Sequence, residues 1–171
     1  DLTGHGIIRG PCGPGMTLVG LTLMAHYRRS TLSLTPYVAP AHQWMDEILD
    51  KTTLTEHQIA EYTGESKDIK PVTVATYHIL TWRPDHTQEY YPHFDLFLAR
   101  NWGLIIYDEV HLLPAPVFRI TAELQAKRRC GLTSHACADD RRHHLFAPRG
   151  RNLYTVLKHS VCRLSNQLWV Y

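Results

Sequence analysis

The chain has 171 residues, of which 44 % are hydrophobic and 20 % charged, the composition of one globular domain with a core of its own. A formal net charge of only +2 excludes a strongly basic overall surface, so any nucleic-acid track must come from local clusters of charge. No apolar run reaches membrane-spanning length and no secretory leader is recognisable, so we expect a cytoplasmic or nuclear protein that is neither secreted nor membrane-bound.

The first predicted element is a weak strand at Ile7-Ile8, and a phosphate-loop pattern follows it. A phosphate loop has the pattern G-x-x-x-x-G-K-[ST], and the chain reads Gly10-Pro11-Cys12-Gly13-Pro14-Gly15-Met16-Thr17. Glycines let the backbone curl so that its N–H groups face phosphate oxygens, and the hydroxyl of Thr17 could reach a magnesium ion. The candidate nucleotide-binding residues are Gly10, Cys12, Gly13, Gly15, Met16 and Thr17.

This loop departs from the pattern at the position of its lysine. Met16 stands where a lysine would bring a positive charge to the β- and γ-phosphates, and methionine cannot supply that charge. Arg9 interrupts the preceding apolar strand, and its side chain must reach solvent or a partner because an unpaired buried charge is costly. The alternative interpretation is a Gly/Pro-rich turn between a strand and a helix that binds nothing.

Helices and strands are predicted to alternate through the middle of the chain, which is typical of α/β sheets. The predicted elements are, in order, a helix over about 17–27, a strand over 31–35, a loop bracketed by Pro36 and Pro40, a helix over 42–50, a helix start at Thr55, a turn over 62–65, a strand over 72–76 and a short helix over 94–100. Residues 81–91 are polar and aromatic. They could stack nucleic-acid bases, or they form a solvated loop anchored by its aromatic side chains.

An apolar run that ends in two adjacent carboxylates, from Gly103 to His111, is the most informative segment. Such a run is typical of a buried parallel strand, and ligands of open α/β sheets bind at the carboxyl ends of the strands. Asp108 and Glu109 would therefore meet a ligand that carries a divalent cation. One carboxylate would hold magnesium and the next would polarise the attacking water. The alternative is a strand that ends in a solvated acidic turn, with His111 as a capping histidine at the surface.

After this strand, Pro114 and Pro116 predict an extended link, and a helix over 117–129 would follow and end at Gly131. The basic cluster at 127–129 suits the negative end of that helix, or it contacts DNA. The last segment reads as an amphipathic helix, or as a patch that binds a phosphate backbone. The four cysteines form no C-x-x-C pair and the 12 histidines no H-E-x-x-H pattern, so we expect no zinc site.

The run from Asp108 to Arg119 resembles the acidic strand end and following segment of superfamily 2 DNA helicases of the xeroderma pigmentosum group B type. The resemblance extends from about Gly6 to about Ser134. Shorter matches that support it are Pro11-Cys12-Gly13 with Gly15 and Thr17, Gln43-Trp44, Glu61-Tyr62-Thr63-Gly64-Glu65 and Val72-Thr73-Val74-Ala75-Thr76-Tyr77.

In that family such a segment is the first of two RecA-like lobes, so the resemblance implies ATP and Mg²⁺ as cofactors and DNA and a second lobe, absent from this chain, as partners. It implies that Thr17 and Asp108 hold the metal, and that Glu109, Asp108 and His111 are catalytic. Thr76 and Tyr77 fall on a segment near the DNA strand, and Thr133 and Ser134 on the motif that links the ATP site to the DNA track. The chain departs from the family at Met16, and again where the linking motif, normally Thr-Ala-Thr, reads Thr133-Ser134-His135.

We therefore predict an α/β P-loop domain of RecA-like fold over residues 1–135, with a largely parallel sheet and helices on both faces. A divergent extension over 136–171 would be helical and packed on the same domain. The expected function is the ATP-binding lobe of an ATP-dependent DNA helicase or translocase, with hydrolysis impaired by Met16 and little activity in the isolated chain. The alternatives are a non-catalytic pseudo-ATPase or truncated module that binds nucleotide, DNA or protein, and a degenerate product without function.

Overall fold

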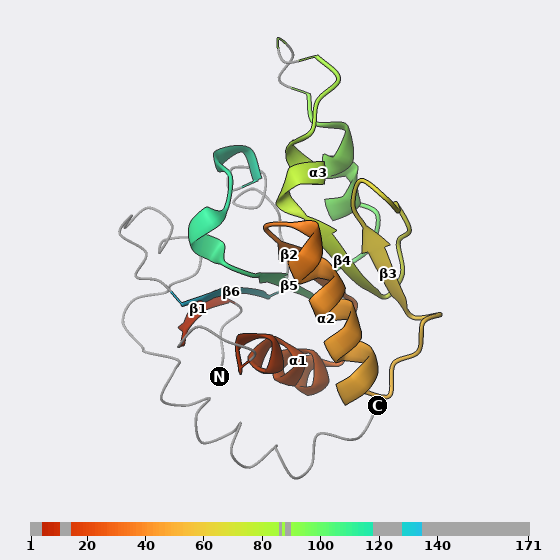
Figure 1. Cartoon of the computed structure of the whole chain (residues 1–171), viewed down its shortest axis with the longest axis vertical. Coiled ribbons are helices and arrows are strands. Elements are labelled where there is room, and N and C mark those ends of the chain that lie inside the picture. Colours follow the sequence, from red (N-terminus) through yellow and green to blue (C-terminus); the bar gives the residue numbers. More distant parts are fainter. Residues whose placement is uncertain (1–4, 11–14, 86, 88–89, 118–127, 135–171) are drawn as a thin grey trace.

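The computed structural model describes residues 5–10, 15–85, 87, 90–117 and 128–134, and its centre is one six-stranded parallel sheet (Figure 1). The strand order is β1-β6-β5-β2-β4-β3, and each neighbouring pair is parallel. The strands are β1 (His5–Arg9), β2 (Thr31–Thr35), β3 (Ile59–Tyr62), β4 (Val72–Thr76), β5 (Leu104–Tyr107) and β6 (Arg129–Thr133). The carboxyl ends of all six strands therefore share one edge of the sheet.

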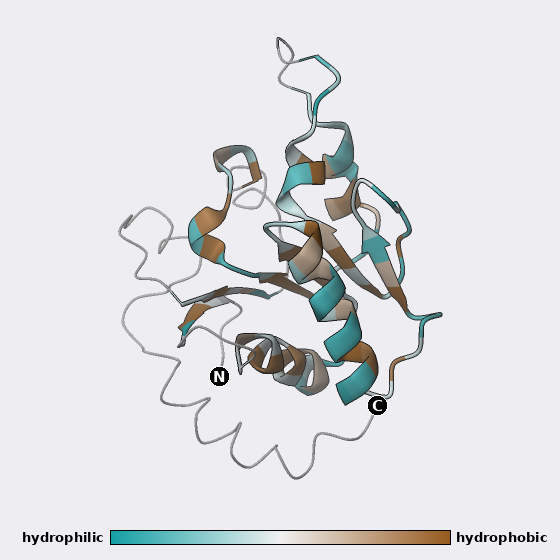
Figure 2. Ribbon diagram, viewed as in Figure 1, coloured by the Kyte–Doolittle hydropathy of each residue, from teal (hydrophilic) through white to brown (hydrophobic). Residues whose placement is uncertain are grey.

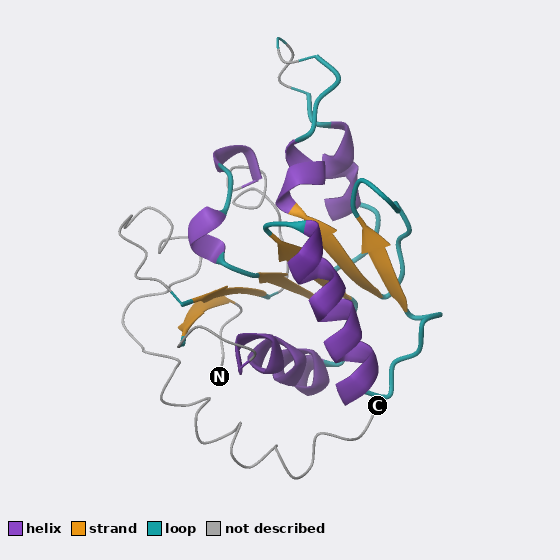
Figure 3. Ribbon diagram, viewed as in Figure 1, coloured by secondary structure: helices purple, strands orange, loops and turns teal. Residues whose placement is uncertain are grey.

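Helices cover both faces of this sheet, as predicted (Figure 3). The described helices are α1 (Gly15–Tyr27), α2 (Val38–Lys51), α3 (Tyr77–Thr81) and two 3-10 helices, η1 (Pro92–Phe97) and η2 (Val110–Leu112). Helices α1 and α2 pack on one face, and α3, η1 and η2 pack on the other. Among the described residues no helix combines the length and the apolar composition that crossing a bilayer would require.

The alternation of side chains along β5 explains why both faces are covered. Leu104 and Ile106 point into the core beneath α1 and α2, whereas Ile105 and Tyr107 point into the core beneath α3 and η1. All four side chains are almost fully buried, as expected for a central parallel strand. Figure 2 shows the apolar centre of the sheet in brown and the solvent side of α2 in teal. Helix α2 is thus an amphipathic helix that packs on the sheet through Trp44 and Ile48.

The strands predicted at 31–35 and 72–76 have these bounds in the structure, and the weak first strand is confirmed as β1. Arg9 is exposed at the end of β1, where a charge costs nothing to keep in water. The predicted loop between Pro36 and Pro40 is wrong, because α2 already begins at Val38. Pro40 lies in the first turn of this helix, where no backbone N–H is needed for a helical hydrogen bond.

The predicted helix start at Thr55 is wrong, and the strand that follows it, β3, was not predicted. The Gln58 side chain does accept a hydrogen bond from the Thr55 N–H, at 3.1 Å, as a capping residue would. The chain then turns and enters β3 at Ile59 instead of continuing as a helix. Pairing of β3 with β4 outweighs the local capping preference.

The segment after η2 also differs from its prediction. Residues 115–117 are already helical, so Pro116 lies within a first helical turn and not in an extended link. Arg129 begins β6, and Gly131 lies inside that strand instead of closing a helix. A Cβ atom at Gly131 would come within 3.1 Å of the Val110 side chain, so glycine lets η2 pack closely on β6. The predicted short helix near Phe94 is the 3-10 helix η1.

Residues 81–91 are described in part, and the rings of Trp82 and Tyr91 contact the chain itself, whereas Tyr90 is exposed. Tyr91 stacks on Phe94 with ring centroids 4.7 Å apart, and Arg83 lies over the Tyr91 ring at 5.0 Å. Trp82 keeps half of its surface exposed while its ring meets His93 edge-on. These contacts fit the interpretation of an anchored loop. The predicted extension over 136–171 lies outside the described residues.

Candidate functional site

The topology brings the two distant motifs to the same edge of the sheet. Strands β1, β6 and β5 are neighbours, so Gly10, Ser134 and Asp108 each follow the carboxyl end of one of three adjacent parallel strands. The Gly10 N–H donates a hydrogen bond of 3.1 Å to the Thr133 carbonyl. Helix α1 connects β1 to the parallel strand β2, so it starts at this same edge, at Gly15. The glycine turn and the acid pair therefore share one edge.

The described part of the phosphate loop consists of its two ends, because Cys12 and Gly13 lie outside the described residues. Gly15 is exposed, and a Cβ atom built on it would meet no atom within 4 Å, so the space beside its backbone is open. Helix α1 carries no acidic residue in its first turn, so no carboxylate of the helix itself offsets its positive N-terminal end. The Thr17 side chain is 7 % exposed. Half-buried Met16 packs on the core beneath α1.

Asp108 is held in place by four hydrogen bonds at the end of β5. Its N–H donates to the Leu34 carbonyl at 2.8 Å, and its carbonyl accepts from the Tyr77 hydroxyl at 2.7 Å. Its carboxylate accepts one bond on each oxygen, from the indole N–H of Trp44 at 3.0 Å and from the N–H of Glu109 at 3.0 Å. The backbone and the side chain of Asp108 are thus both fixed.

Burial raises the pKa of the Asp108 carboxyl above its ordinary value, because the ionised form loses water there. The Trp44 hydrogen bond acts in the opposite direction, and the negative charge of Glu109 adds to the rise. A cation bound to the ionised carboxylate would offset this cost of desolvation.

Glu109 adopts a backbone conformation that non-glycine residues rarely take. Its φ of 46° and ψ of 54° lie in the left-handed region, which costs a non-glycine residue roughly 1 kcal/mol or more. Its Oε2 atom is buried and accepts no hydrogen bond, although His111 Nδ1 lies 3.2 Å away. A carboxylate held in a strained conformation at this edge can accept a proton from a water molecule or orient that water.

His111 connects the acid pair to β6. Its Nδ1 atom forms a 2.9 Å hydrogen bond with the Thr133 hydroxyl, and the Thr133 carbonyl in turn accepts from Gly10. A chain of contacts thus runs from Glu109 through His111 and Thr133 to the start of the phosphate loop. Ser134, the next residue, is half-buried.

The structure places Thr76 and Tyr77 beneath the surface. The Thr76 side chain is 1 % exposed and caps α3 by accepting a bond from the Ile79 N–H. Tyr77 is 2 % exposed, and its hydroxyl supports the Asp108 carbonyl. Both side chains are therefore buried, and the Tyr77 hydroxyl supports the end of β5 from within.

Trp44 is the site residue that sequence reasoning missed. Its side chain is 1 % exposed and lies in the core. The partner of its indole N–H lies 64 positions away in the chain, and no local pattern reveals such a contact. The one available signal was the Gln43-Trp44 match within the family resemblance.

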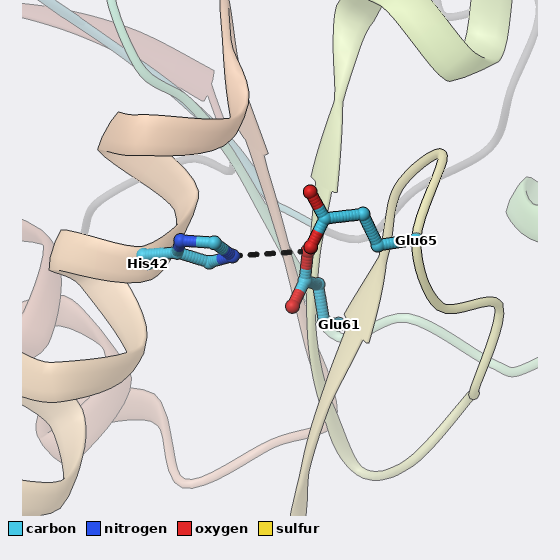
Figure 4. A group of neighbouring side chains, drawn as sticks. All are labelled: His42, Glu61 and Glu65. Carbon is cyan, nitrogen blue, oxygen red and sulfur yellow. Dashed lines mark ion pairs between the residues drawn. The ribbon is translucent and has the colours of Figure 1, made fainter.

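One further group of possible metal ligands occurs in the part of the chain that the structure describes: His42, Glu61 and Glu65 (Figure 4). Their donor atoms lie within 4.8 Å of one another, and His42 Nε2 is 3.4 Å from Glu61 Oε1. That oxygen already accepts a hydrogen bond of 2.6 Å from Thr63. The group lies at β3, and β2 and β4 separate it from β5. Since His42 and Glu65 are exposed, the contact is that of a surface ion pair.

Comparison with known proteins identifies the family. Residues 2–135 match the family model described as "Type III restriction enzyme, res subunit". The chain belongs to this family. It is also 53 % identical over 139 residues to the DNA 3'-5' helicase XPB of Kineococcus radiotolerans and 52 % identical to that of Mycobacterium tuberculosis. These matches confirm the resemblance to helicases of the xeroderma pigmentosum group B type.

The matches cover most of this chain but a small part of the relatives. The aligned segment is 81 % of this chain and 24 % and 25 % of the two XPB proteins, so the chain spans about a quarter of the curated relatives it matches. Among solved structures, the UvsW helicase of bacteriophage T4 matches with a TM-score of 0.65 over 84 % of this chain and 52 % of that chain, at 19 % identity. The Sulfolobus solfataricus SWI2/SNF2 ATPase core, solved with dsDNA, matches with a TM-score of 0.62 over 97 % of this chain and 36 % of that chain, at 17 % identity. These structural neighbours confirm the predicted RecA-like fold.

Proposed function

We propose that this chain is the nucleotide-binding first lobe of an ATP-dependent DNA helicase or translocase, with magnesium-ATP bound where β1, β6 and β5 end. The observation that carries the proposal is the unbroken set of contacts from Gly10 through Thr133 and His111 to Glu109, next to the fixed carboxylate of Asp108. DNA and a second RecA-like lobe would be the partners. The printed names of the relatives, DNA 3'-5' helicases, support this choice of substrate.

The residues present at this edge fit magnesium and a triphosphate. Magnesium prefers hard oxygen ligands and usually takes only a few of its six from the protein, and the Asp108 carboxylate and Thr17 hydroxyl are ligands of that kind. The open space beside Gly15 and the N-terminus of α1, whose first turn has no acidic residue, suit a phosphate group. When bound, magnesium would neutralise charge on the β- and γ-phosphates.

The roles of the protein groups follow from their positions. Asp108 and Thr17 would hold the metal. Glu109 would orient the attacking water with its carboxylate and accept a proton from it. His111 is hydrogen-bonded to Thr133, so a movement of Glu109 would be transmitted through His111 to Thr133 and Ser134 at the end of β6. Such a link is what couples the state of the nucleotide to a neighbouring surface.

We further propose that hydrolysis is impaired, because Met16 supplies no charge and packs on the core beneath α1. Removing one electrostatic group of this kind costs about 10²–10³ in rate. The same observation favours a second candidate function, a non-catalytic module that binds nucleotide without turnover. The two candidate functions differ in the result expected when a lysine replaces Met16. The helicase lobe would then hydrolyse ATP, whereas the non-catalytic module would not.

The test is the substitution Met16→Lys, measured for magnesium-ATP affinity and for hydrolysis with and without duplex DNA. Met45→Lys is the matched control, since Met45 is another partly buried methionine packed on the same core, but on α2. We expect Met16→Lys to raise affinity and hydrolysis and Met45→Lys to raise neither. Higher affinity without turnover would support the non-catalytic module. If neither the original chain nor Met16→Lys bound magnesium-ATP, the proposed site would be wrong.

A further inference from the structure

The indole of Trp44 contacts both the Asp108 carboxylate and the helix that follows the phosphate loop. Its Nε1–H donates a 3.0 Å hydrogen bond to Asp108 Oδ2. Its six-membered ring lies so close to α1 that a Cβ atom on Gly20 would be 2.2 Å from Cη2. Helix α1 begins with the last residues of the phosphate loop. One rigid ring therefore spans from the helix behind the phosphate loop to the acid pair.

We propose that Trp44 is a positioning residue for the cation site, acting through Asp108. This inference rests on the proposed function, because it assigns Asp108 to the metal. Trp44 itself touches no substrate in the proposal. The role of Trp44 is to fix the rotation of the Asp108 carboxylate and to hold α1 in a fixed position relative to β5.

The hydrogen bonds at Asp108 explain why this donor matters. One carboxylate oxygen accepts from Glu109 and the other from Trp44, so the two donors together stop the group from turning about its Cβ–Cγ bond. Each oxygen keeps a second lone pair for a metal ion or for a water molecule bound to it. Without the indole N–H, Oδ2 would lose the one hydrogen bond found for it, in a half-buried position, and the carboxylate could swing away from the metal.

An indole suits this role because its N–H is neutral and can only donate. A lysine or arginine at this position would compete with the metal ion for the carboxylate. A hydroxyl could reverse its direction and accept instead. The ring is also stiff and fully buried, so the N–H is presented in one orientation at little further cost in conformational entropy.

The test compares Trp44→Phe with Trp102→Phe. Both substitutions keep an aromatic ring and remove one buried indole hydrogen bond, because Trp102 Nε1 donates to the Leu96 carbonyl at 2.9 Å beneath the other face of the sheet. Binding of a non-hydrolysable ATP analogue is titrated with magnesium and in EDTA. We expect Trp44→Phe to weaken the magnesium-dependent part of the affinity by about 10–100-fold, the usual effect of losing a group that orients a metal ligand. Trp102→Phe should leave that part unchanged.

A double-mutant cycle with Asp108→Asn separates positioning from general damage to the fold. If Trp44 acts through the Asp108 carboxylate, Trp44→Phe will change the affinity little once Asp108 is replaced. Equal losses in both backgrounds, or equal losses for Trp44→Phe and Trp102→Phe, would overturn the inference while leaving the proposed function intact. Failure of the unsubstituted chain to bind the analogue in a magnesium-dependent way would instead refute the proposed function.

Discussion

The contact between Gly20 and Trp44 makes one substitution, Gly20→Ala, especially informative. The added Cβ atom would lie 2.2 Å from Trp44 Cη2 and 3.0 and 3.2 Å from two neighbouring ring atoms. Ordinary carbon contacts begin at about 3.5 Å, so the indole or α1 must move by roughly 1 Å. Trp44 is enclosed in the core, so this movement cannot be absorbed at the surface.

The magnitude can be worked out from three contributions. Inserting a methyl group into a well-packed core costs typically about 1–3 kcal/mol. A hydrogen bond to a charged group contributes about 1.5–3 kcal/mol, and part of it is lost if the indole shifts away from Asp108. Alanine in a helix gains back up to about 1 kcal/mol relative to glycine. We therefore expect a net loss of about 1–3 kcal/mol, each kcal/mol lowering the melting temperature by roughly 2–4 °C.

The assay is thermal and urea unfolding of Gly20→Ala beside Gly64→Ala. A Cβ atom at Gly64 would meet nothing within 4 Å, so this control adds the same methyl group without a clash. The Gly20→Ala protein should also bind magnesium-nucleotide more weakly than the control. If Gly20→Ala were as stable as Gly64→Ala and bound nucleotide equally well, the close contact between α1 and the indole would not exist in solution.

Two further outcomes are expected. In the Met16→Lys background, Glu109→Gln should keep the affinity for magnesium-nucleotide and lower the rate of hydrolysis by about 10²–10⁴-fold, the range of general acid–base catalysis. An unchanged rate of hydrolysis would show that Glu109 takes no part in the reaction. Burial lowers the pKa of His93, and the Lys67 charge lowers it further, so the unfolded chain binds this proton more readily and stability should fall as the pH drops below about 6.5. His93→Gln should weaken that acid dependence, and identical pH–stability curves would contradict the assignment.

The parts of the fold that could be predicted are those whose local pattern agrees with their pairing. Strands β2 and β4 both alternate, β2 is followed by Pro36 and β4 is preceded by Pro71, and their bounds were predicted correctly. Strand β5 was found because its apolar run ends in two carboxylates. These segments carry their own signal, so the sheet and the edge that holds Asp108 could be inferred from them.

The parts that could not be predicted depend on contacts between distant residues. Strand β6 begins with Arg129 and contains a glycine, features that locally favour the end of a helix, and it is pairing with β1 and β5 that makes it a strand. Strand β3 follows a capping pattern at Thr55 and is formed by pairing with β4. The bond from Trp44 to Asp108 joins residues whose proximity only the assembled fold creates.

The central claim is that a magnesium-bound triphosphate occupies the edge where β1, β6 and β5 end. Backbone hydrogen exchange with and without a magnesium-bound, non-hydrolysable ATP analogue tests this claim most directly. It should slow at Gly15–Thr17, at Asp108–His111 and at Thr133–Ser134, and stay unchanged in the turn at Gly64. Protection confined to the surroundings of His42, Glu61 and Glu65, or no protection by the analogue at any of these positions, would contradict the account.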